Sequence, residues 1–159
     1  SIEPAPAVAK IRPRGTEQDL RATMDVYCVG AGLGEPPVIT HGMLCQFGRI
    51  IDNREFWLNS APGIYGNSGG ALFLAETMEM IGVPARIAVQ FSGFAADAIT
   101  HLMYAIPFTR IYDFLEAQCF RFISDATFTE EGEAKERARK RKAEERRMAT
   151  EEEHGEEIT

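Results

Sequence analysis

The chain has 159 residues, of which 45% are hydrophobic and 26% are charged, and its formal net charge is -7. These values are ordinary for a globular domain and argue against bulk electrostatic binding to nucleic acid. The sequence has no apolar run of about 18 residues, so no membrane span is predicted. Its three cysteines and three histidines are widely spaced and match no metal-binding pattern, so we expect no metal or other cofactor and a reducing intracellular compartment.

Six short segments with the composition of β-strands follow one another, separated by turn-forming residues. They are residues 24–30, 38–47, 54–60, 70–75, 80–91 and 101–107. Pro84 lies inside the fifth segment and indicates an edge strand or a bulge, because proline cannot donate to a strand ladder. Six short strands with turn signals between them predict an all-β barrel or sandwich.

After residue 107 the apolar residues change from alternation to helical spacing. The residues at that spacing are Phe108, Ile111, Tyr112, Leu115 and Cys119. They predict one amphipathic helix within residues 108–123, which would close the barrel. From Glu130 onward the chain is almost entirely charged residues and alanine. We predict a solvated or partly frayed helix there, because the segment has strong helix formers but no apolar stripe.

Local side-chain pairs support a helix in this charged tail. Glutamates lie four residues before a basic residue in Glu131–Lys135, Glu133–Arg137 and Glu136–Lys140. Thr127 followed by Glu130 fits a capping box at the start of the helix. The basic run from Arg137 to Lys142 is either a nucleic-acid or localisation patch or a solvated stretch. The flanking glutamates favour the solvated interpretation, because they partly cancel the local field.

Four glycines surround a single serine in residues 61–73, which read APGIYGNSGGALF. Glycine is costly to order and is used where the backbone turns sharply or approaches another group closely. A nucleophilic serine needs a base, and the oxyanion that forms needs donors such as backbone N–H groups. The N–H groups of Gly66 and Ser68 could point to one spot and form such an oxyanion hole. The same composition is typical of a polar turn, so the loop alone leaves both interpretations open.

The loop resembles the GDSGG-type nucleophile loop of trypsin-like (chymotrypsin-fold) serine peptidases, and the resemblance continues on both sides of it. The matching segments, in order, are IRPRGTEQDLRATMDVYCVG, VYCVGAGLGEPPVITHG, FWLNSAPGIYGNSGGALF, MIGVPARIAV, HLMYAIP and FTRIYDFLEA, and they cover roughly residues 8–120. They are most similar to the bacterial heat-shock and viral polyprotein branches. Each segment alone is a weak signal, whereas the ordered set is fairly specific.

The resemblance implies an all-β fold, namely the second six-stranded barrel of a chymotrypsin-like fold, closed by a C-terminal helix. That barrel and helix would occupy residues 15–124. Residues 1–14 would be a linker or the last strand of a first barrel, and residues 125–159 a charged helical or disordered tail.

The resemblance also implies a serine endopeptidase, in which Ser68 is the nucleophile and Gly66 and Ser68 donate the oxyanion-hole N–H groups. Asn67 stands where the family more often has aspartate, which in digestive enzymes pairs with a newly cut N-terminal amine. Asparagine cannot form that ion pair, so activation by N-terminal trimming is not expected.

The same resemblance assigns substrate contacts. The strand around Ala85, Arg86 and Ile87 would pair with an extended polypeptide substrate. Pro62 falls where the family places the base of its primary specificity pocket. Proline offers no carboxylate there, so a preference for lysine or arginine is not implied, and a small or apolar preference is the expectation.

The family's catalytic histidine and aspartate come from the first barrel, upstream of all the matched segments. His41 and His101 are candidates within the chain, but a lone histidine on an apolar strand is more often packed or at the surface. We therefore expect the first barrel in a longer precursor or in a partner chain, and a nearly inert chain without it. The alternative is a catalytically inactive, peptidase-derived binding or structural module with a charged interaction tail.

Two other enzyme classes fit fragments of the sequence. Gly30, Gly32 and Gly34 follow a predicted strand, as in a dinucleotide-binding loop, but that motif needs a helix immediately afterwards, whereas EPPVIT follows here. The pentapeptide GNSGG also satisfies the G-x-S-x-G pattern of α/β-hydrolases. That fold requires a helix directly after the serine, and two glycines start a helix poorly.

Overall fold

The computed structural model describes residues 8–93 and 95–156. The chain forms two compact units, Ser1–Ile111 and Tyr112–Thr159, which are described separately. The strands are β1 (Asp25–Gly30), β2 (Val38–Ile51), β3 (Arg54–Asn59), β4 (Ala71–Leu74), β5 (Met80–Ser92) and β6 (Ala95–Pro107). The helices are α1 (Phe108–Ala117) and α2 (Glu130–Glu156), with single 3-10 turns at Glu17–Asp19, Gly32–Gly34 and Arg121–Ile123. No helix within the described residues is both long and apolar enough to cross a membrane.

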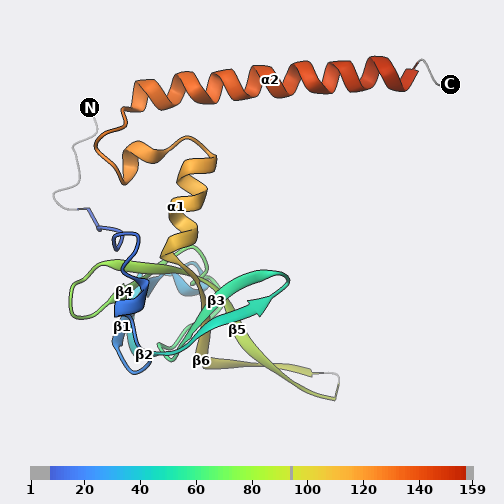
Figure 1. Ribbon diagram of the computed structural model, residues 1–159. Coiled ribbons are helices and arrows are strands. Elements are labelled where there is room, and N and C mark those ends of the chain that lie inside the picture. Colours follow the sequence, from blue (N-terminus) through green and yellow to red (C-terminus); the bar gives the residue numbers. More distant parts are fainter. Residues whose placement is uncertain (1–7, 94, 157–159) are drawn as a thin grey trace. The chain divides into compact units, whose positions relative to one another are not determined.

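The six strands form a closed antiparallel barrel in the order β1-β2-β3-β6-β5-β4, which confirms the predicted all-β barrel (Figure 1). Alternate residues of each strand point inward, as the strand period of two requires. The fully buried side chains of the barrel include Val26, Cys28, Leu44, Leu72, Ile81 and Ala105. Phe108, the first residue of α1, is also buried and packs edge-on against Trp57, with ring centroids 5.9 Å apart. Closure gives every strand two neighbours, although β5 continues beyond its pairing with β4, which ends at Gly82.

All six predicted strands exist, but two are longer than the sequence indicated. β2 continues to Ile51 and β6 begins at Ala95, whereas we expected these strands to end at residue 47 and to begin at residue 101. The extension of β2 has a local cause. Asp52 and Asn53 both have positive φ angles, 51° and 58°, as in the two-residue turns that suit the twist of a β-hairpin. This turn pairs Ile51 with Arg54 directly and carries β2 through to the hairpin end.

The chain before β1 also contacts the barrel. Ile11 forms a parallel bridge with Met80, and Arg12 donates a backbone hydrogen bond of 3.0 Å to the Met80 carbonyl. The Arg12 guanidinium forms an ion pair of 3.0 Å with Glu79. Residues 1–7 of the expected linker or strand lie outside the described residues, and the assignment of residues 1–14 to a first barrel or linker stays a prediction.

The helix expected within residues 108–123 is α1, which ends at Ala117 and so coincides with the matched segment FTRIYDFLEA, while Cys119 lies beyond it. Cys119 has a φ of +55°, and the N–H of Phe120 bonds to the carbonyl of Leu115 at 2.7 Å. A residue with left-handed backbone geometry just past the last turn is the usual way to end an α-helix. The apolar residues that follow Ala117 belong to a separate 3-10 turn, Arg121–Ile123, and not to α1.

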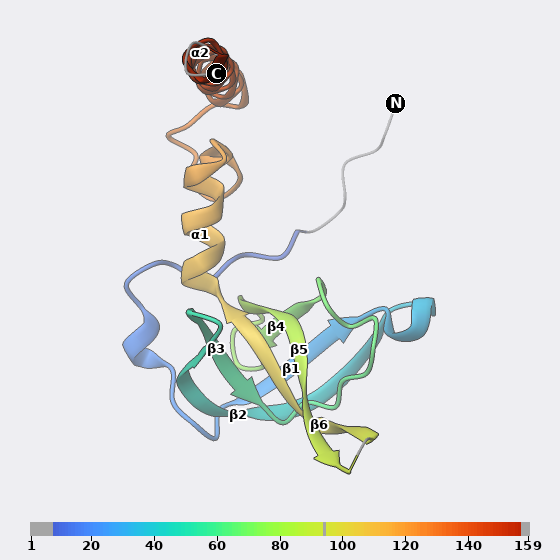
Figure 2. The ribbon, with the colours of Figure 1, turned by 90° about the vertical axis from the view of Figure 1, so that its right-hand side faces the viewer.

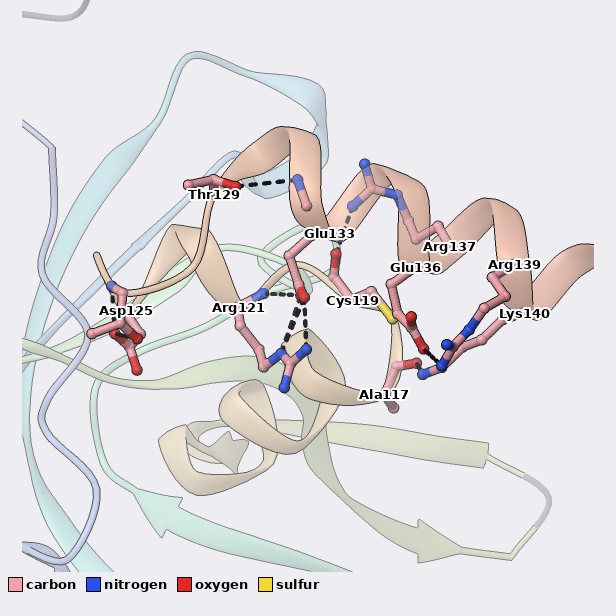
Figure 3. A network of polar contacts seen from close by, with 12 residues as sticks. Ala117, Cys119, Arg121, Asp125, Thr129, Glu133, Glu136, Arg137, Arg139 and Lys140 are labelled. Carbon is pink, nitrogen blue, oxygen red and sulfur yellow. Dashed lines mark hydrogen bonds and ion pairs between the residues drawn. The ribbon is translucent and has the colours of Figure 1, made fainter.

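The second unit is held by polar contacts between α2 and the segment that ends α1 (Figure 3). The Glu133 carboxylate accepts hydrogen bonds from the Arg121 backbone N–H at 3.0 Å and from its guanidinium at 2.7 Å. Arg137 donates to the carbonyl of Cys119, and Lys140 donates to the carbonyl of Ala117 at 3.2 Å. Basic side chains at the C-terminal carbonyls of a helix complement both its unpaired acceptors and its dipole.

These contacts correct three details predicted for the tail. The hydroxyl that caps α2 belongs to Thr129, which accepts from the Gly132 N–H at 3.1 Å, so the capping box of Thr127 and Glu130 was wrong. Thr127 instead donates its hydroxyl to Asp125 at 2.7 Å. Glu133 is not solvated, since it is only 3% exposed, and its closest basic partner is Arg121.

Of the predicted acid-to-base pairs, Glu131–Lys135 is confirmed at 2.7 Å. Glu136 pairs with Arg139 at 3.0 Å rather than with Lys140, whose ammonium group bonds to the Ala117 carbonyl. The expected pair four residues apart gives way here because Lys140 reaches an unpaired helix carbonyl.

Candidate functional site

The serine loop connects β3 to β4 and is held against β5. The Ser68 hydroxyl is exposed and donates a hydrogen bond of 3.1 Å to the carbonyl of Ala85. The next N–H, of Gly69, donates to the carbonyl of Pro84 at 2.9 Å. The register of β5 against β6 shifts between Pro84 and Arg86, which leaves Ala85 in a bulge. Pro84 predicted an edge strand or a bulge, and the structure has the bulge, which presents two successive carbonyls to the serine loop.

A second set of contacts fixes the fold of the loop itself. The Asn67 N–H donates to the Ile64 carbonyl, and the Gly70 N–H to the Asn67 carbonyl, both at 3.1 Å. The loop is tied to the turn after β1 because the Leu33 N–H donates to the Tyr65 carbonyl at 2.8 Å.

Glycine is required at Gly66 by both conformation and space. Its φ is +101°, which side chains of L-residues rarely adopt, and a Cβ there would lie 2.6 Å from the Leu33 nitrogen and 2.8 Å from the Ala31 oxygen. These are backbone atoms, which cannot swing aside as the end of a flexible side chain does. The close approach of two loops therefore explains why the sequence has glycine here.

Two backbone donors beside the Ser68 hydroxyl are unused. Gly66 and Ser68 are both exposed, and within residues 8–93 and 95–156 their N–H groups donate to no protein acceptor. Their neighbours at Asn67, Gly69 and Gly70 all donate to carbonyls of the barrel or loop. Exposed N–H groups on a loop whose fold is fixed by neighbouring hydrogen bonds can hold an anionic oxygen without reorganisation.

An apolar hollow of about 540 Å³ lies beside the serine. Its walls come from the end of β1, the start of β4 and the start of β5. The lining residues that carry side-chain bulk are Val29, Pro37, Phe73 and Met80, together with Ser68.

The side chain of Asn67 is buried beneath the loop, a feature that the sequence did not indicate. It is 3% exposed, and its Nδ2 lies 4.0 Å from the Cys28 sulfur. Its Oδ1 has no hydrogen-bond partner in the described part of the chain. A Cβ at Gly32 would lie 2.9 Å from that oxygen, so a glycine turn covers it. Burial raises the pKa of the Cys28 thiol and keeps it protonated.

The predicted substrate strand lies next to the serine, but among the residues that the structure describes no hydrogen bond joins Pro62 to that strand. β4 pairs with β5 only from Met80 to Gly82, so among the described strands nothing pairs with that side of Ala85, Arg86 and Ile87. The Arg86 guanidinium forms an ion pair of 2.8 Å with Asp52.

Pro62 is exposed and lies in a segment fixed to two other strands. Its carbonyl accepts a hydrogen bond of 2.7 Å from the Thr40 hydroxyl on β2. The neighbouring Gly63 N–H donates to the Thr100 carbonyl on β6 at 2.7 Å. Its expected role at the base of a specificity pocket stays a prediction.

Neither candidate histidine is joined to Ser68 by a hydrogen bond in the described residues. His41 lies on β2 opposite Tyr27, and its Nε2 is 3.3 Å from an Asp25 carboxylate oxygen. His101 lies in β6 between Ile99 and Met103, where the register against β5 shifts. The structure thus gives His41 an acidic partner, which the sequence did not suggest, but places that pair on the β1–β2 wall.

The two other enzyme classes lack the structural context that they need. The glycine turn after β1 is followed by strand β2, where a dinucleotide-binding loop requires a helix. Ser68 is followed by strand β4, where an α/β-hydrolase requires a helix.

No family model matches the chain. The chain is 31% identical over 96 residues to a probable periplasmic serine endoprotease, DegP-like, from Pseudomonas fluorescens, and the match covers 58% of this chain and 19% of that protein. Two structures of the HtrA-type protease AlgW are similar, one with a tripeptide and one with a decapeptide, both with a TM-score of 0.57 and 23% identity. The similarity covers 78% of this chain and 39% of the tripeptide complex, and 74% and 34% for the decapeptide complex.

The chain therefore spans about a fifth of the curated relative and between a third and two fifths of the solved structures that it matches. Its six-stranded barrel with a C-terminal helix has the fold of one barrel of a chymotrypsin-like protein.

Proposed function

We propose that this chain is the nucleophile-bearing half of a serine endopeptidase. The observation that carries the proposal is an exposed Ser68 flanked by two unused backbone donors on a loop fixed to the neighbouring strand. The fold shared with HtrA-type proteases supports it, as does the similarity to a DegP-like endoprotease. The narrower assignment to a heat-shock or viral polyprotein branch rests on the sequence resemblance alone.

The reaction is acyl transfer. The Ser68 oxygen forms a bond to the substrate carbonyl carbon while a base takes its proton, and the N–H groups of Gly66 and Ser68 hold the resulting oxyanion. The C–N bond then breaks, and the amine leaves with the proton returned by the base. Water, deprotonated by the same base, attacks the acyl group and releases Ser68. Loss of one oxyanion donor typically lowers such a rate by about 100- to 1,000-fold.

The base comes from outside the described residues in this proposal, because His41 is paired with Asp25 on the β1–β2 wall. We assign it to a first barrel, in a longer precursor or in a partner chain. The apolar hollow beside Ser68 suits such a partner, since burying Val29, Phe73 and Met80 would favour association.

The substrate is a polypeptide bound as an added strand along the unpaired side of β5. Backbone pairing of this kind tolerates many sequences, so specificity depends on side-chain subsites. Pro62 provides no negative charge for a basic side chain. Asn67 is uncharged, so it cannot form the ion pair with a new N-terminus that aspartate forms at this position.

A fluorophosphonate probe tests the proposal on the protein that includes both barrels. We expect time-dependent labelling on the Ser68 peptide by mass spectrometry, where the serine oxygen bonds to phosphorus and fluoride leaves. The Ser68→Ala variant should fold equally well and take no label. A folded two-barrel protein that takes no label would favour the inactive binding module instead.

A further inference from the structure

The β5–β6 hairpin continues past the barrel as an arm, residues 88–93 and 95–99, which Figure 2 shows projecting from the barrel wall. Within the arm Ala88 pairs with Ile99, and the ladder runs to Ser92 opposite Ala95. β4 leaves β5 at Gly82, so in the described structure the second side of β5 has no strand partner along the arm. Unpaired N–H and C=O groups on such a side can pair with another extended chain.

One face of the arm is entirely apolar. Directly opposite residues of an antiparallel pair share a face, which places Val89 with Ala98 and Phe91 with Ala96. Val89 is 44% exposed and Phe91 is 73% exposed. We call Val89, Phe91, Ala96 and Ala98 the arm face. The opposite face is mixed, since it carries the polar pair Gln90–Asp97 and the apolar pair Ala88–Ile99.

The arm face continues the strand that passes the serine. Ala85 accepts the Ser68 hydrogen bond, and β5 runs from there to the arm, with a second register shift after Ile87. Every strand of the barrel pairs antiparallel with its neighbours, and antiparallel pairing is the more stable kind. A peptide added antiparallel to β5 therefore places its residues upstream of the scissile bond along the arm.

We propose that the arm face is an apolar subsite for the substrate segment upstream of the scissile bond, with Val89 and Phe91 as its specificity-determining residues. This rests on the proposed function. Val89 and Phe91 lie four and six residues beyond Ala85, or roughly 14 and 20 Å along an extended strand. Apolar side chains of the substrate, at about the fourth to seventh position before the scissile bond, would therefore cover Val89 and Phe91. Alternate positions face the arm, because side chains of a strand alternate.

Three fluorescent peptide boronic acids test this on the chain itself, since boron bonds directly to a serine oxygen. One has three alanines, one has eight residues with leucine at the fourth to seventh positions from boron, and one has serine at those positions. Binding is measured by anisotropy to the unaltered chain, to Phe91→Ser and to Gln90→Ser. The two variants change neighbouring residues on opposite faces, and Phe91 is exposed enough that its loss leaves the core intact.

We expect the leucine probe to bind at least tenfold more tightly than the serine probe, and Phe91→Ser to remove about that factor. Gln90→Ser should change nothing, and the three-alanine probe should bind all chains equally. Equal binding of the leucine and serine probes overturns the proposal, as does a Phe91→Ser variant that weakens all three probes alike. A Phe91→Ser variant that lowers the molar mass by light scattering also overturns it, because the arm face would then join two copies.

Failure of the proposed function gives a different pattern. An eight-residue leucine peptide that ends in an amide instead of boron would then bind as well as its boronic acid, and Ser68→Ala would change neither. Dependence on Phe91 in that case keeps the arm subsite while removing the role of Ser68.

Discussion

Gly66 offers the sharpest test of how the serine loop is built. A Gly66→Ala change meets two costs. The backbone at φ +101° is strained for any residue with a Cβ, by about 1–2 kcal/mol. The new Cβ would also lie 2.6 Å from the Leu33 nitrogen and 2.8 Å from the Ala31 oxygen, and overpacking of this kind costs about 1–3 kcal/mol. We expect a total loss in unfolding free energy of about 2–5 kcal/mol.

Gly15→Ala is the matched control for the conformational part. Gly15 has a similar φ of +79°, but nothing lies within 4 Å of its Cβ position. It should therefore lose only about 1–2 kcal/mol. The difference between the two variants isolates the contact of the Gly66 loop with the turn after β1, where the Leu33 N–H bonds to Tyr65.

Urea unfolding and binding of the three-alanine boronic acid measure both consequences. Gly66→Ala should be less stable than Gly15→Ala by at least about 1 kcal/mol and should lose most of its affinity for the probe, because the Gly66 N–H moves. Gly15→Ala should bind the probe normally. Equal stability of the two variants, together with unchanged probe binding by Gly66→Ala, would refute both the rigid loop and the donor role of Gly66.

Three further predictions concern ionisation and burial. Hydrogen bonds from Arg121 lower the pKa of Glu133 in the folded unit below its usual value of 4.5. The stabilisation from these bonds is therefore fully present above pH 4.5, and it is lost as the pH falls through the pKa that Glu133 has in the folded unit. Glu133→Gln should reduce this acid sensitivity in the helical circular dichroism. Iodoacetamide should modify Cys45 in the folded chain but reach the buried Cys28 only in urea, and equal rates would contradict its burial. Asn67→Asp places a carboxylate in a buried site that offers it no cation. We expect a loss in unfolding free energy of roughly 3 kcal/mol at pH 8 and a smaller loss at pH 5, because burial raises the carboxyl pKa. A loss that does not depend on pH would show that the carboxyl group is solvated.

The features that the sequence predicted correctly are those that neighbouring residues determine. All six strands were predicted because alternation and turn residues are properties of neighbouring positions. The bulge near Pro84 was predicted for the same reason, since a residue without an N–H interrupts a ladder wherever it lies. The ion pair Glu131–Lys135 was found because a helix alone brings those positions together.

The candidate site also combines features that the sequence predicts with features that it does not. The glycines and Ser68 indicated a tight loop. The reason that Gly66 must lack a Cβ is visible only in the structure, where the loop contacts Leu33 and Ala31. The burial of Asn67 depends on Gly32, which is distant in sequence. No local pattern distinguishes an asparagine covered by a separate turn from one that faces water.

The sequence by itself indicated the six strand segments, the serine loop and the helical character of the tail. Only the tertiary structure decided that Glu133 bonds to Arg121 instead of facing solvent, and that Arg137 and Lys140 bond to carbonyls at the end of α1. The physical reason is that these outcomes depend on unpaired helix carbonyls and on charged groups brought together by folding. Such groups take the nearest partner in space, whatever the separation along the chain.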